Sequence, residues 1–396
     1  MVITSSRTMM TIAEASTLTS LPAATLKPIP YSQRQLLLYD PRQPYMLHTN
    51  KEIPELRFGD LLVEVYGIGL NQIDWKPTLR AGEWVLAVST DHRDLRKAAF
   101  QEYAIVSCYN AIRIPKHVEP FQVASMGVAY VTAGLALGVC LGLTFNKGPK
   151  QKEFNLLENA RMYPENVPDD IADEVFDAMA PCYQAQPGEW LLVSGAKLGG
   201  LKVVGAADLS SHGKLSQSLG TDVLIDLNNL DQAKRDIKRL TPGSLRLAID
   251  AVGPESAEWC QQVLAERTSS RYCRPGHETP TNPLPVDAAA RGGGSKLSHL
   301  VALSGKPGTY NPNIQVHTVP IKLFHTSPYV GGHLSKWLYE LLDTNKIQPP
   351  EVEFVPGGLA AINGALETLR QGKMSGKRLV IRVKEPDVKI GSLSPT

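Results

Sequence analysis

The sequence predicts an α/β protein whose second half forms a doubly wound parallel sheet. Short apolar runs bounded by glycine, aspartate or polar residues are typical of strands that are buried on both faces. Segments with helical spacing of apolar residues lie between these runs, around 230–240 and 256–264. Strands that alternate with helices indicate a parallel sheet with helices packed on it. The expected strands are Leu191–Ser194, Leu201–Ala207, Val223–Asp226, Leu245–Asp250 and Leu300–Leu303.

The connection between the first two of these strands is unusually short. Only Lys197–Gly200 lie between the end of the first segment, at Ala196, and the run that begins at Leu201. A parallel pair normally needs a crossover of about a dozen residues or more. Either the two strands do not pair in parallel, or part of the unit that should join them is absent. In the second case we expect one face of Leu191–Ser194 to be uncovered, because the missing helix would have packed there.

The rest of the chain is expected to mix strands and helices. Asp60–Asn71 and Phe100–Val106 have the pattern of strands. Apolar residues mixed with Gly and Ala predict a buried helix over 124–143, and the acidic segment 145–187 predicts a short helix near 170–179. The remaining expected elements are helices around 334–342 and 359–369, a closing strand over 378–383 and a loop over 267–298.

Length and composition indicate a globular protein of two domains. The chain has 396 residues, of which 43% are hydrophobic and 20% charged, and its formal net charge is +2. This near-neutral balance gives no electrostatic reason to bind nucleic acid or a membrane surface. No apolar run reaches the roughly 18 residues that a membrane helix needs. The Ser/Thr/Ala-rich residues 1–30 are expected to be a disordered leader.

Cysteine and histidine give no pattern of a metal site. The five cysteines are scattered singly, which favours a reduced, cytoplasmic compartment and argues against a disulfide framework. No Cys/His/Glu set with metal-ligand spacing is present, so no metal is expected. The nine histidines, His325 among them, are expected at the surface or at helix caps.

Six motifs together carry a resemblance to a known family, and they occur in the family's order. The motifs are Gly69–Lys76, Ala98–Tyr103, Gly127–Gly134, Ser218–Asp222, Ile249–Gly253 and Ser375–Val380. Each is weak alone, but their order resembles the zinc-free, quinone-oxidoreductase branch of the medium-chain dehydrogenase/reductase superfamily. More closely, the chain resembles the fungal trans-acting enoyl reductases that serve iterative polyketide synthases. The resemblance covers about Tyr31 to Val383.

The resemblance implies a fold, a reaction and a partner. It implies a GroES-like, mostly β catalytic domain over 31–127 and 320–396, and a Rossmann-type NADP-binding domain over 128–319. The implied activity is reduction of the C=C bond of a carrier-protein-bound polyketide intermediate by NADPH. The implied partner is an iterative polyketide synthase or a polyketide synthase–peptide synthetase hybrid, and the implied state of the reductase is a monomer.

Two segments of the family pattern are absent from this chain. After Lys76 the family has a long segment before its next strand, whereas here Pro77 leads almost directly to Val85. After Ala196 the family has a turn and an Ala-rich helix, whereas here Lys197 follows at once. The first crossover helix of the nucleotide-binding domain is therefore expected to be missing.

The second gap leaves few candidate residues for binding the phosphates of the cofactor. Phosphate binding normally uses free backbone N–H groups at a helix N-terminus. Gly195, Gly199 and Gly200 remain as candidates, although a simple glycine-rich turn explains them as well. The other cofactor-binding residues that the resemblance implies are Asn71, Gln72, Ile73, Asp74, Leu303, Ser304, Met374 and Ser375.

The end of the second strand gives two opposed indications about the cofactor. The resemblance places four residues beside the adenosine ribose and its 2′-phosphate, and so implies NADPH: Leu209, Ser210, Ser211 and His212. Lys214 is close enough in the sequence to help neutralise the phosphate. Helix capping is the alternative role for the two serines. Asp208 points the other way, because an acid at this position usually accepts a hydrogen bond from a free 2′-hydroxyl.

Lys76 and Thr132 are the candidate catalytic residues that the resemblance implies. A cation or donor beside the substrate carbonyl would stabilise the enolate that forms as hydride reaches the β-carbon. Alternatively, Lys76 is a solvated lysine with no catalytic role. The Thr132 hydroxyl, for its part, could instead form a hydrogen bond to the backbone of its own helix. The implied acyl-site residues are Gly127, Val128, Ala129, Tyr130, Val131, Thr132, Ala133, Gly134, Lys322, Leu323 and Phe324. Tight helix packing is the alternative role for the small residues among them.

Two other functions compete with enoyl reduction in trans. The two gaps favour a degenerate, non-catalytic family member that binds a synthase or an acyl chain. A reductase of small quinones or enones is the third hypothesis, and the long acidic segment 145–187 favours the synthase-partner hypothesis over it.

Overall fold

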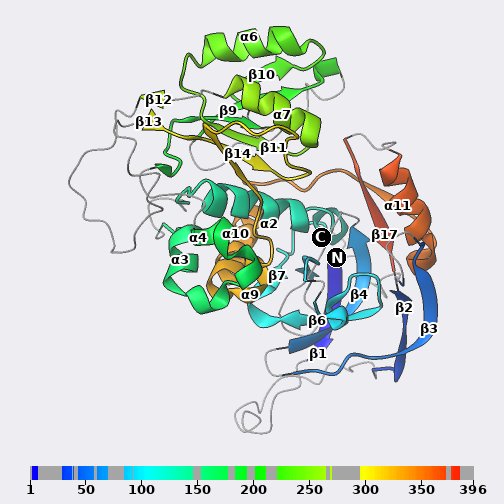
Figure 1. The fold of residues 1–396 in the computed structure, drawn as a ribbon. Helices are drawn as coiled ribbons and strands as arrows, with labels where there is room; N and C mark the ends of the chain where they lie inside the picture. Colours follow the sequence, from blue (N-terminus) through cyan, green and yellow to red (C-terminus); the bar gives the residue numbers. More distant parts are fainter. Residues whose placement is uncertain are drawn as a thin grey trace, which may run out of the picture. The chain divides into compact units, whose positions relative to one another are not determined.

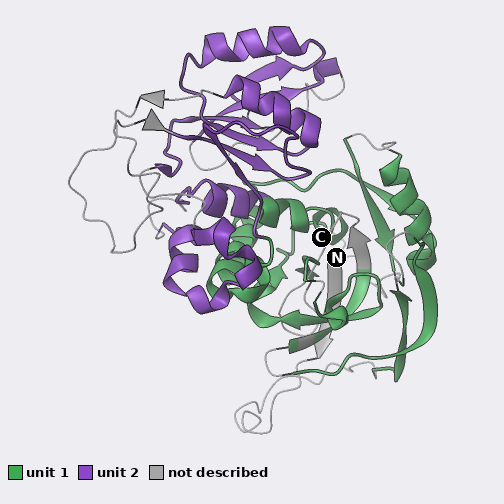
Figure 2. Cartoon of the chain, viewed as in Figure 1, with its two compact units in different colours: residues 1–132, 321–396 green, residues 133–320 purple. Residues whose placement is uncertain are grey.

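The structure, a computed structural model, contains two compact units. Unit 1 consists of residues 1–132 and 321–396, and unit 2 of residues 133–320 (Figure 2). Unit 1 is mostly β and unit 2 is a doubly wound α/β domain, so the predicted fold class is confirmed. The structure describes residues 2–7, 29–37, 39, 43–57, 60–69, 84–91, 93–145, 153–176, 183–193, 201–210, 221–264, 268–269, 295–371 and 376–383.

Unit 2 is built on one parallel sheet of six strands (Figure 1). The order is β10-β9-β8-β11-β14-β15, and all neighbours are parallel. The near-continuous apolar runs of these strands fit an all-parallel sheet, because the strands of such a sheet are buried on both faces. The strands are β8 (Trp190–Val193), β9 (Lys202–Ala207), β10 (Val223–Asp226), β11 (Leu247–Asp250), β14 (Ser298–Ala302) and β15 (Ile314–His317).

The first two strands, β8 and β9, pair in parallel despite their short connection. Trp190 lies opposite Lys202, and Val193 lies opposite Gly205. The alternative that these strands do not pair in parallel is therefore wrong. The chain has to return only about 10 Å along the strand. Residues 194–201 span up to about 25 Å when extended, which is enough for the return without a helix.

Strand β8 is not uncovered, which corrects the expectation drawn from the missing helix. Leu192 is 2% exposed and packs in one core with Ile237 of α6 (Leu230–Leu240) and Ala257 of α7 (Pro254–Val263). Leu191, whose side chain points to the opposite face, is 3% exposed. Side chains on both faces of β8 are thus buried, and α6 and α7 supply the packing on the face of Leu192.

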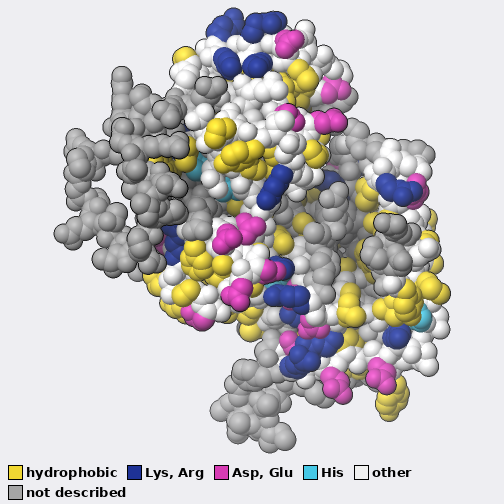
Figure 3. Space-filling view, viewed as in Figure 1, with side chains coloured by type: hydrophobic (Ala, Val, Ile, Leu, Met, Phe, Trp, Pro, Cys, Tyr) yellow, Lys and Arg dark blue, Asp and Glu magenta, His cyan; other side chains and the backbone are white. Residues whose placement is uncertain are grey.

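Helices α6 and α7, which pack on this sheet, have recognisable signals at their ends. The side chain of Asn229 accepts a hydrogen bond from the backbone N–H of Gln232 and so caps α6. Lys238 and Arg239 lie in its last turn, and Lys and Arg side chains gather over α6 in Figure 3. Helix α7 has Pro254 in its first turn, where no N–H is needed.

The helix predicted over 124–143 is divided in the structure. Helix α1 (Pro120–Val123) and helix α2 (Gly127–Leu135) precede a π-helical turn, η3, over Ala136–Cys140. Gly138 in this turn lies against Phe145 and Leu156 so closely that a Cβ would be 2.6 Å from the Phe145 ring. Two further helices in the described part of unit 2 are α3 (Leu156–Met162) and α4 (Ala172–Phe176); the latter lies within the predicted acidic helix.

Unit 1 is built on a seven-stranded sheet with the order β16-β17-β4-β1-β5-β7, in which β6 also pairs with β4. Its neighbours are antiparallel except β16 and β17. Residues 2–7, expected in a disordered leader, instead form β1 with the extended pairing that Val-Ile-Thr favours. The strands are β1 (Val2–Arg7), β4 (Asp60–Gly69), β5 (Val85–Leu86), β6 (Tyr103–Ser107), β7 (Ile112–Arg113), β16 (Val352–Val355) and β17 (Arg378–Arg382).

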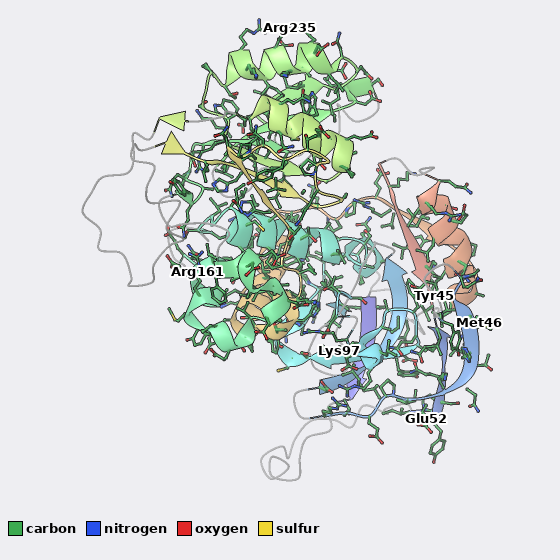
Figure 4. The ribbon with its side chains drawn as sticks, viewed as in Figure 1. Tyr45, Met46, Glu52, Lys97, Arg161 and Arg235 are labelled. Carbon is green, nitrogen blue, oxygen red and sulfur yellow. The ribbon has the colours of Figure 1, made fainter. Side chains whose placement is uncertain are left out.

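A separate hairpin and three helices complete unit 1. The hairpin pairs β2 (Ser32–Leu37) with β3 (Met46–Glu52). Tyr45, directly before β3, exchanges two hydrogen bonds with Asn363 of α11 (Ile362–Arg370), and Figure 4 shows it beside that helix. The other helices are α9 (Leu323–Thr326) and α10 (Pro328–Asp343). Within the described ranges, no helix is long and apolar enough to cross a membrane.

Candidate functional site

The carboxyl edge of the six-stranded sheet is where this topology binds ligands. In a doubly wound sheet, ligands bind outside the carboxyl ends of the two central strands between which the order reverses, here β8 and β11. Three aspartates mark this edge: Asp208 follows β9, Asp226 ends β10 and Asp250 ends β11. Their surroundings differ, and the differences decide what each can do.

Asp250 holds the turn from β11 into α7. Its Oδ1 accepts a hydrogen bond from Ser256 Oγ at 2.6 Å, and its Oδ2 accepts one from the Gly253 N–H at 3.1 Å. The side chain is buried. Because both oxygens are engaged by the turn, Asp250 shapes the edge beside the switch point and does not itself face a ligand.

Asp208 and Asp226 lie at the ends of neighbouring strands, where Asp226 is paired with Ala207. Oδ1 of Asp208 accepts hydrogen bonds from Ser210 N at 2.9 Å and from Ser210 Oγ at 2.6 Å. Leu209 N donates to Asp226 Oδ1 at 3.4 Å. The structure thus places two of the predicted cofactor residues, Leu209 and Ser210, beside a pair of carboxylates.

Leu303 and Ser304 lie at the same edge, after β14. The Leu303 N–H donates to the carbonyl of Asp250 at 2.8 Å, and Ser304 Oγ donates to the carbonyl of Ala251 at 2.9 Å. These bonds fix the two residues next to the end of β11. The structure therefore brings four predicted cofactor residues, Leu209, Ser210, Leu303 and Ser304, to the ligand edge of one sheet.

Two helices that carry predicted acyl residues, α2 and α9, contact helix α10 of unit 1. Tyr130 OH donates to the carbonyl of Leu334 at 2.9 Å, and α9 leads directly into α10. Tyr130, Val131, Leu323 and Phe324 are buried. Among the other members of this set, Gly127 is buried, Val128 and Lys322 are half-buried and Ala129 is exposed; beyond the unit boundary, Ala133 is half-buried and Gly134 buried.

Thr132 has a half-buried side chain on α2. Its hydroxyl makes no hydrogen bond to any residue in the described ranges. By contrast, Thr241 donates to the carbonyl of Ile237 and Thr368 to that of Gly364, each within or at the end of its helix. The back-bonded conformation weighed for Thr132 is therefore not the one it adopts, and its hydroxyl keeps its donor capacity.

Several predicted residues lie outside the part of the chain that the structure describes. They belong to the two interrupted segments, to the phosphate turn and to the residues before β17. They are Lys76, Asn71, Gln72, Ile73, Asp74, Gly195, Gly199, Gly200, Ser211, His212, Met374 and Ser375.

Three histidines are buried, which corrects their expected place at the surface. His325, directly after Phe324, contacts Thr90 Oγ1 through Nε2 and lies 3.3 Å from Asn110 Nδ2 through Nδ1. His299 and His317 meet with Nδ1 and Nε2 2.9 Å apart and with stacked rings. Each imidazole has a polar partner inside the protein, and such a partner lowers the free-energy cost of burying a polar ring.

Asp226 and Asn228 were missed as candidate site residues. Their signal was present in the sequence, because Asp226 ends a predicted strand and Asn228 follows it closely. The structure adds the register of β9 and β10, which brings Asp226 beside Asp208.

A groove of about 960 Å³ lies at the opposite edge of this sheet. Leu245 and Asn313, which line it, precede β11 and β15, so the groove is at the amino ends of the strands. It is therefore separate from the ligand edge described above.

Comparison with known proteins identifies relatives of the chain. A trans-enoyl reductase from a Fusarium species, fsa3, is 24% identical over 335 residues, covering 81% of this chain and 80% of the relative. The trans-enoyl reductase resD of Aspergillus sclerotiorum is 22% identical over 388 residues, covering 87% and 98%. The enoyl reductase component of lovastatin nonaketide synthase, lovC, from Aspergillus terreus is 23% identical, covering 73% and 72%. No protein-family model matches the sequence.

Solved structures share the fold. The CurK enoyl reductase superposes with a TM-score of 0.57 at 14% identity, covering 89% of this chain and 99% of that one. A quinone oxidoreductase from Pseudomonas syringae pv. Tomato superposes with a TM-score of 0.55 at 15% identity, covering 88% and 99%. The chain is therefore similar to named fungal trans-enoyl reductases and shares the fold of solved enoyl reductases and quinone oxidoreductases.

Proposed function

We propose that this protein is a trans-acting enoyl reductase that reduces the C=C bond of a carrier-protein-bound polyketide intermediate with a nicotinamide dinucleotide. The observation that carries the proposal is the six-stranded parallel sheet of order β10-β9-β8-β11-β14-β15, whose ligand edge holds four predicted cofactor residues. The similarity to named trans-enoyl reductases supports the substrate class and the polyketide synthase partner.

The described residues fit the adenosine half of such a cofactor. Leu209 and Ser210 follow β9, where the ribose of a dinucleotide lies in this topology, and Leu303 and Ser304 lie beside the switch point. When bound, the nicotinamide supplies a hydride to the β-carbon of the enoyl thioester, and water supplies the proton for the α-carbon. The resemblance implies NADPH, a preference taken up in the next subsection.

The chain's own catalytic contribution is stabilisation of charge on the thioester oxygen. As the β-carbon accepts hydride, negative charge develops on that oxygen, and a positioned donor lowers the barrier. Thr132 has a hydroxyl that is not used within its helix, and Lys76 remains the candidate cation. Gly127 to Gly134 and Lys322 to Phe324 are proposed to hold the acyl chain. We also propose that the protein acts as a monomer in the cytoplasm.

Replacing Thr132 with alanine is expected to lower kcat for an enoyl thioester about a hundredfold, the effect of removing one oxyanion donor. The measurement is the steady-state oxidation of reduced dinucleotide with crotonyl-pantetheine as substrate. Thr368→Ala is the matched control, because Thr368 is also a helical threonine but donates within α11. An unchanged kcat in Thr132→Ala would show that Thr132 contributes to packing and not to catalysis.

The same assay separates the competing functions. Turnover of a small quinone but not of the thioester would favour the small-molecule reductase. Saturable binding of the thioester without turnover would favour the degenerate, non-catalytic relative, which the short connection between β8 and β9 makes the main competitor. Turnover of the thioester, faster when it is carried on a carrier protein, is the result expected of the proposed function.

A further inference from the structure

We infer that this protein takes NADH in preference to NADPH, because Asp208 and Asp226 together present two carboxylates where the adenosine ribose would lie. The inference rests on the proposed function, since it concerns the cofactor of that reaction. It departs from the NADPH that the family resemblance implies.

The two carboxylates are held together at one place. Asn228 donates from Nδ2 to Oδ1 of Asp208 at 3.3 Å and to Oδ1 of Asp226 at 3.0 Å. The backbone N–H of Asn228 also donates to Asp226 Oδ1 at 3.2 Å. A single asparagine thus links the carboxylates at the ends of β9 and β10, and both remain at the edge of the sheet that faces the ligand.

Ser210 is engaged with the carboxylate and not held for a phosphate. Its hydroxyl donates to Asp208 Oδ1 at 2.6 Å, and its backbone N–H donates to the same oxygen at 2.9 Å. A phosphate accepts hydrogen bonds and needs donors, whereas a free 2′-hydroxyl can donate one. Asp208 therefore suits the free hydroxyl of NADH, and it competes with a 2′-phosphate for the donors of Ser210.

Charge leads to the same preference. A 2′-phosphate carries negative charge, and placing it beside a carboxylate is unfavourable because like charges repel. Asp208 and Asp226 place two carboxylates here, whereas Lys214, a nearby cation in the sequence, lies outside the described residues.

The test is equilibrium binding of NADH and NADPH to the full-length protein, measured by nicotinamide fluorescence. We expect NADH to bind at least about tenfold more tightly. In Asp208→Asn, the ratio should shift towards NADPH by about tenfold, since one of the two carboxylates becomes neutral while the shape is kept. Asp226→Asn should shift it in the same direction. Asp231→Asn, an exposed acid in the first turn of α6, is the control and should leave the ratio unchanged.

Each outcome decides the matter. Tighter binding of NADPH by the wild-type protein, or a ratio that Asp208→Asn does not change, would overturn the inference, as would the absence of saturable binding by either dinucleotide. A preference for NADH without turnover of any enoyl thioester would support the inference and overturn the proposed function. Turnover with NADPH as the better donor would support the proposed function and overturn the inference.

Discussion

Replacing Glu189 with alanine is expected to destabilise unit 2 by about 3 to 5 kcal/mol, because it leaves a buried guanidinium without its counter-charge. Arg246 is 1% exposed and donates through Nε and Nη2 to the two oxygens of Glu189, at 2.7 and 2.5 Å. Arg246 also donates to the carbonyls of Tyr183 and Gln184, which fixes the chain before β8. The measurement is hydrogen exchange of the β8 and β11 amides, which reports on this unit alone.

Two further variants make this test specific. Arg239→Ala removes an exposed ion pair with Asp236 and should cost no more than about 0.5 kcal/mol. The double variant Glu189→Ala/Arg246→Met removes the buried charge as well, so it should be more stable than Glu189→Ala alone. A double variant less stable than the single one would contradict an unpaired buried charge as the cause.

Acidification is expected to destabilise the same unit by about 3 kcal/mol through His317. Burial lowers the pKa of His317 from its usual 6.5 to about 4, so the folded protein keeps this imidazole neutral. The unfolded chain binds the proton at higher pH than the folded chain. Stability is therefore complete above pH 6.5 and is lost as the pH falls from 6.5 towards 4.

A neutral replacement isolates this effect. His317→Gln should remove most of the pH dependence between pH 6.5 and 4, whatever it does to stability at neutral pH. His117→Gln changes an exposed histidine and should leave the dependence as it is in the wild-type protein. The measurement is the midpoint of urea unfolding as a function of pH. A wild-type midpoint that does not fall across this interval would contradict the burial of a neutral His317.

Most of the fold could be predicted from the sequence, because strand and helix signals are local. The apolar runs at 191–194 and 223–226 and the capped helix after Asn229 have boundaries in the structure close to those expected. The helix over 124–143 was only partly right, since its spacing of apolar residues does not distinguish an α-helix from the π-turn at Ala136–Cys140.

The candidate site was less predictable because it depends on pairing between distant segments. Ser210 could be named from the family resemblance, but the nearness of Asp226 to Asp208 follows from the register of β9 and β10. The short connection after β8 misled the expectation of an uncovered strand. A missing helix is visible in a sequence, whereas the packing that replaces it is not.

The most direct test of the central claim is transfer of hydride from the dinucleotide to an enoyl thioester. The full-length protein would be mixed with crotonyl-pantetheine and a reduced dinucleotide deuterated at the transferable C4 position, and the product examined by mass spectrometry and NMR. We predict butyryl-pantetheine that carries the deuterium on its β-carbon, with the α-carbon proton drawn from solvent. Recovery of unreduced thioester from reactions in which the dinucleotide binds, or product without deuterium on the β-carbon, would contradict the account.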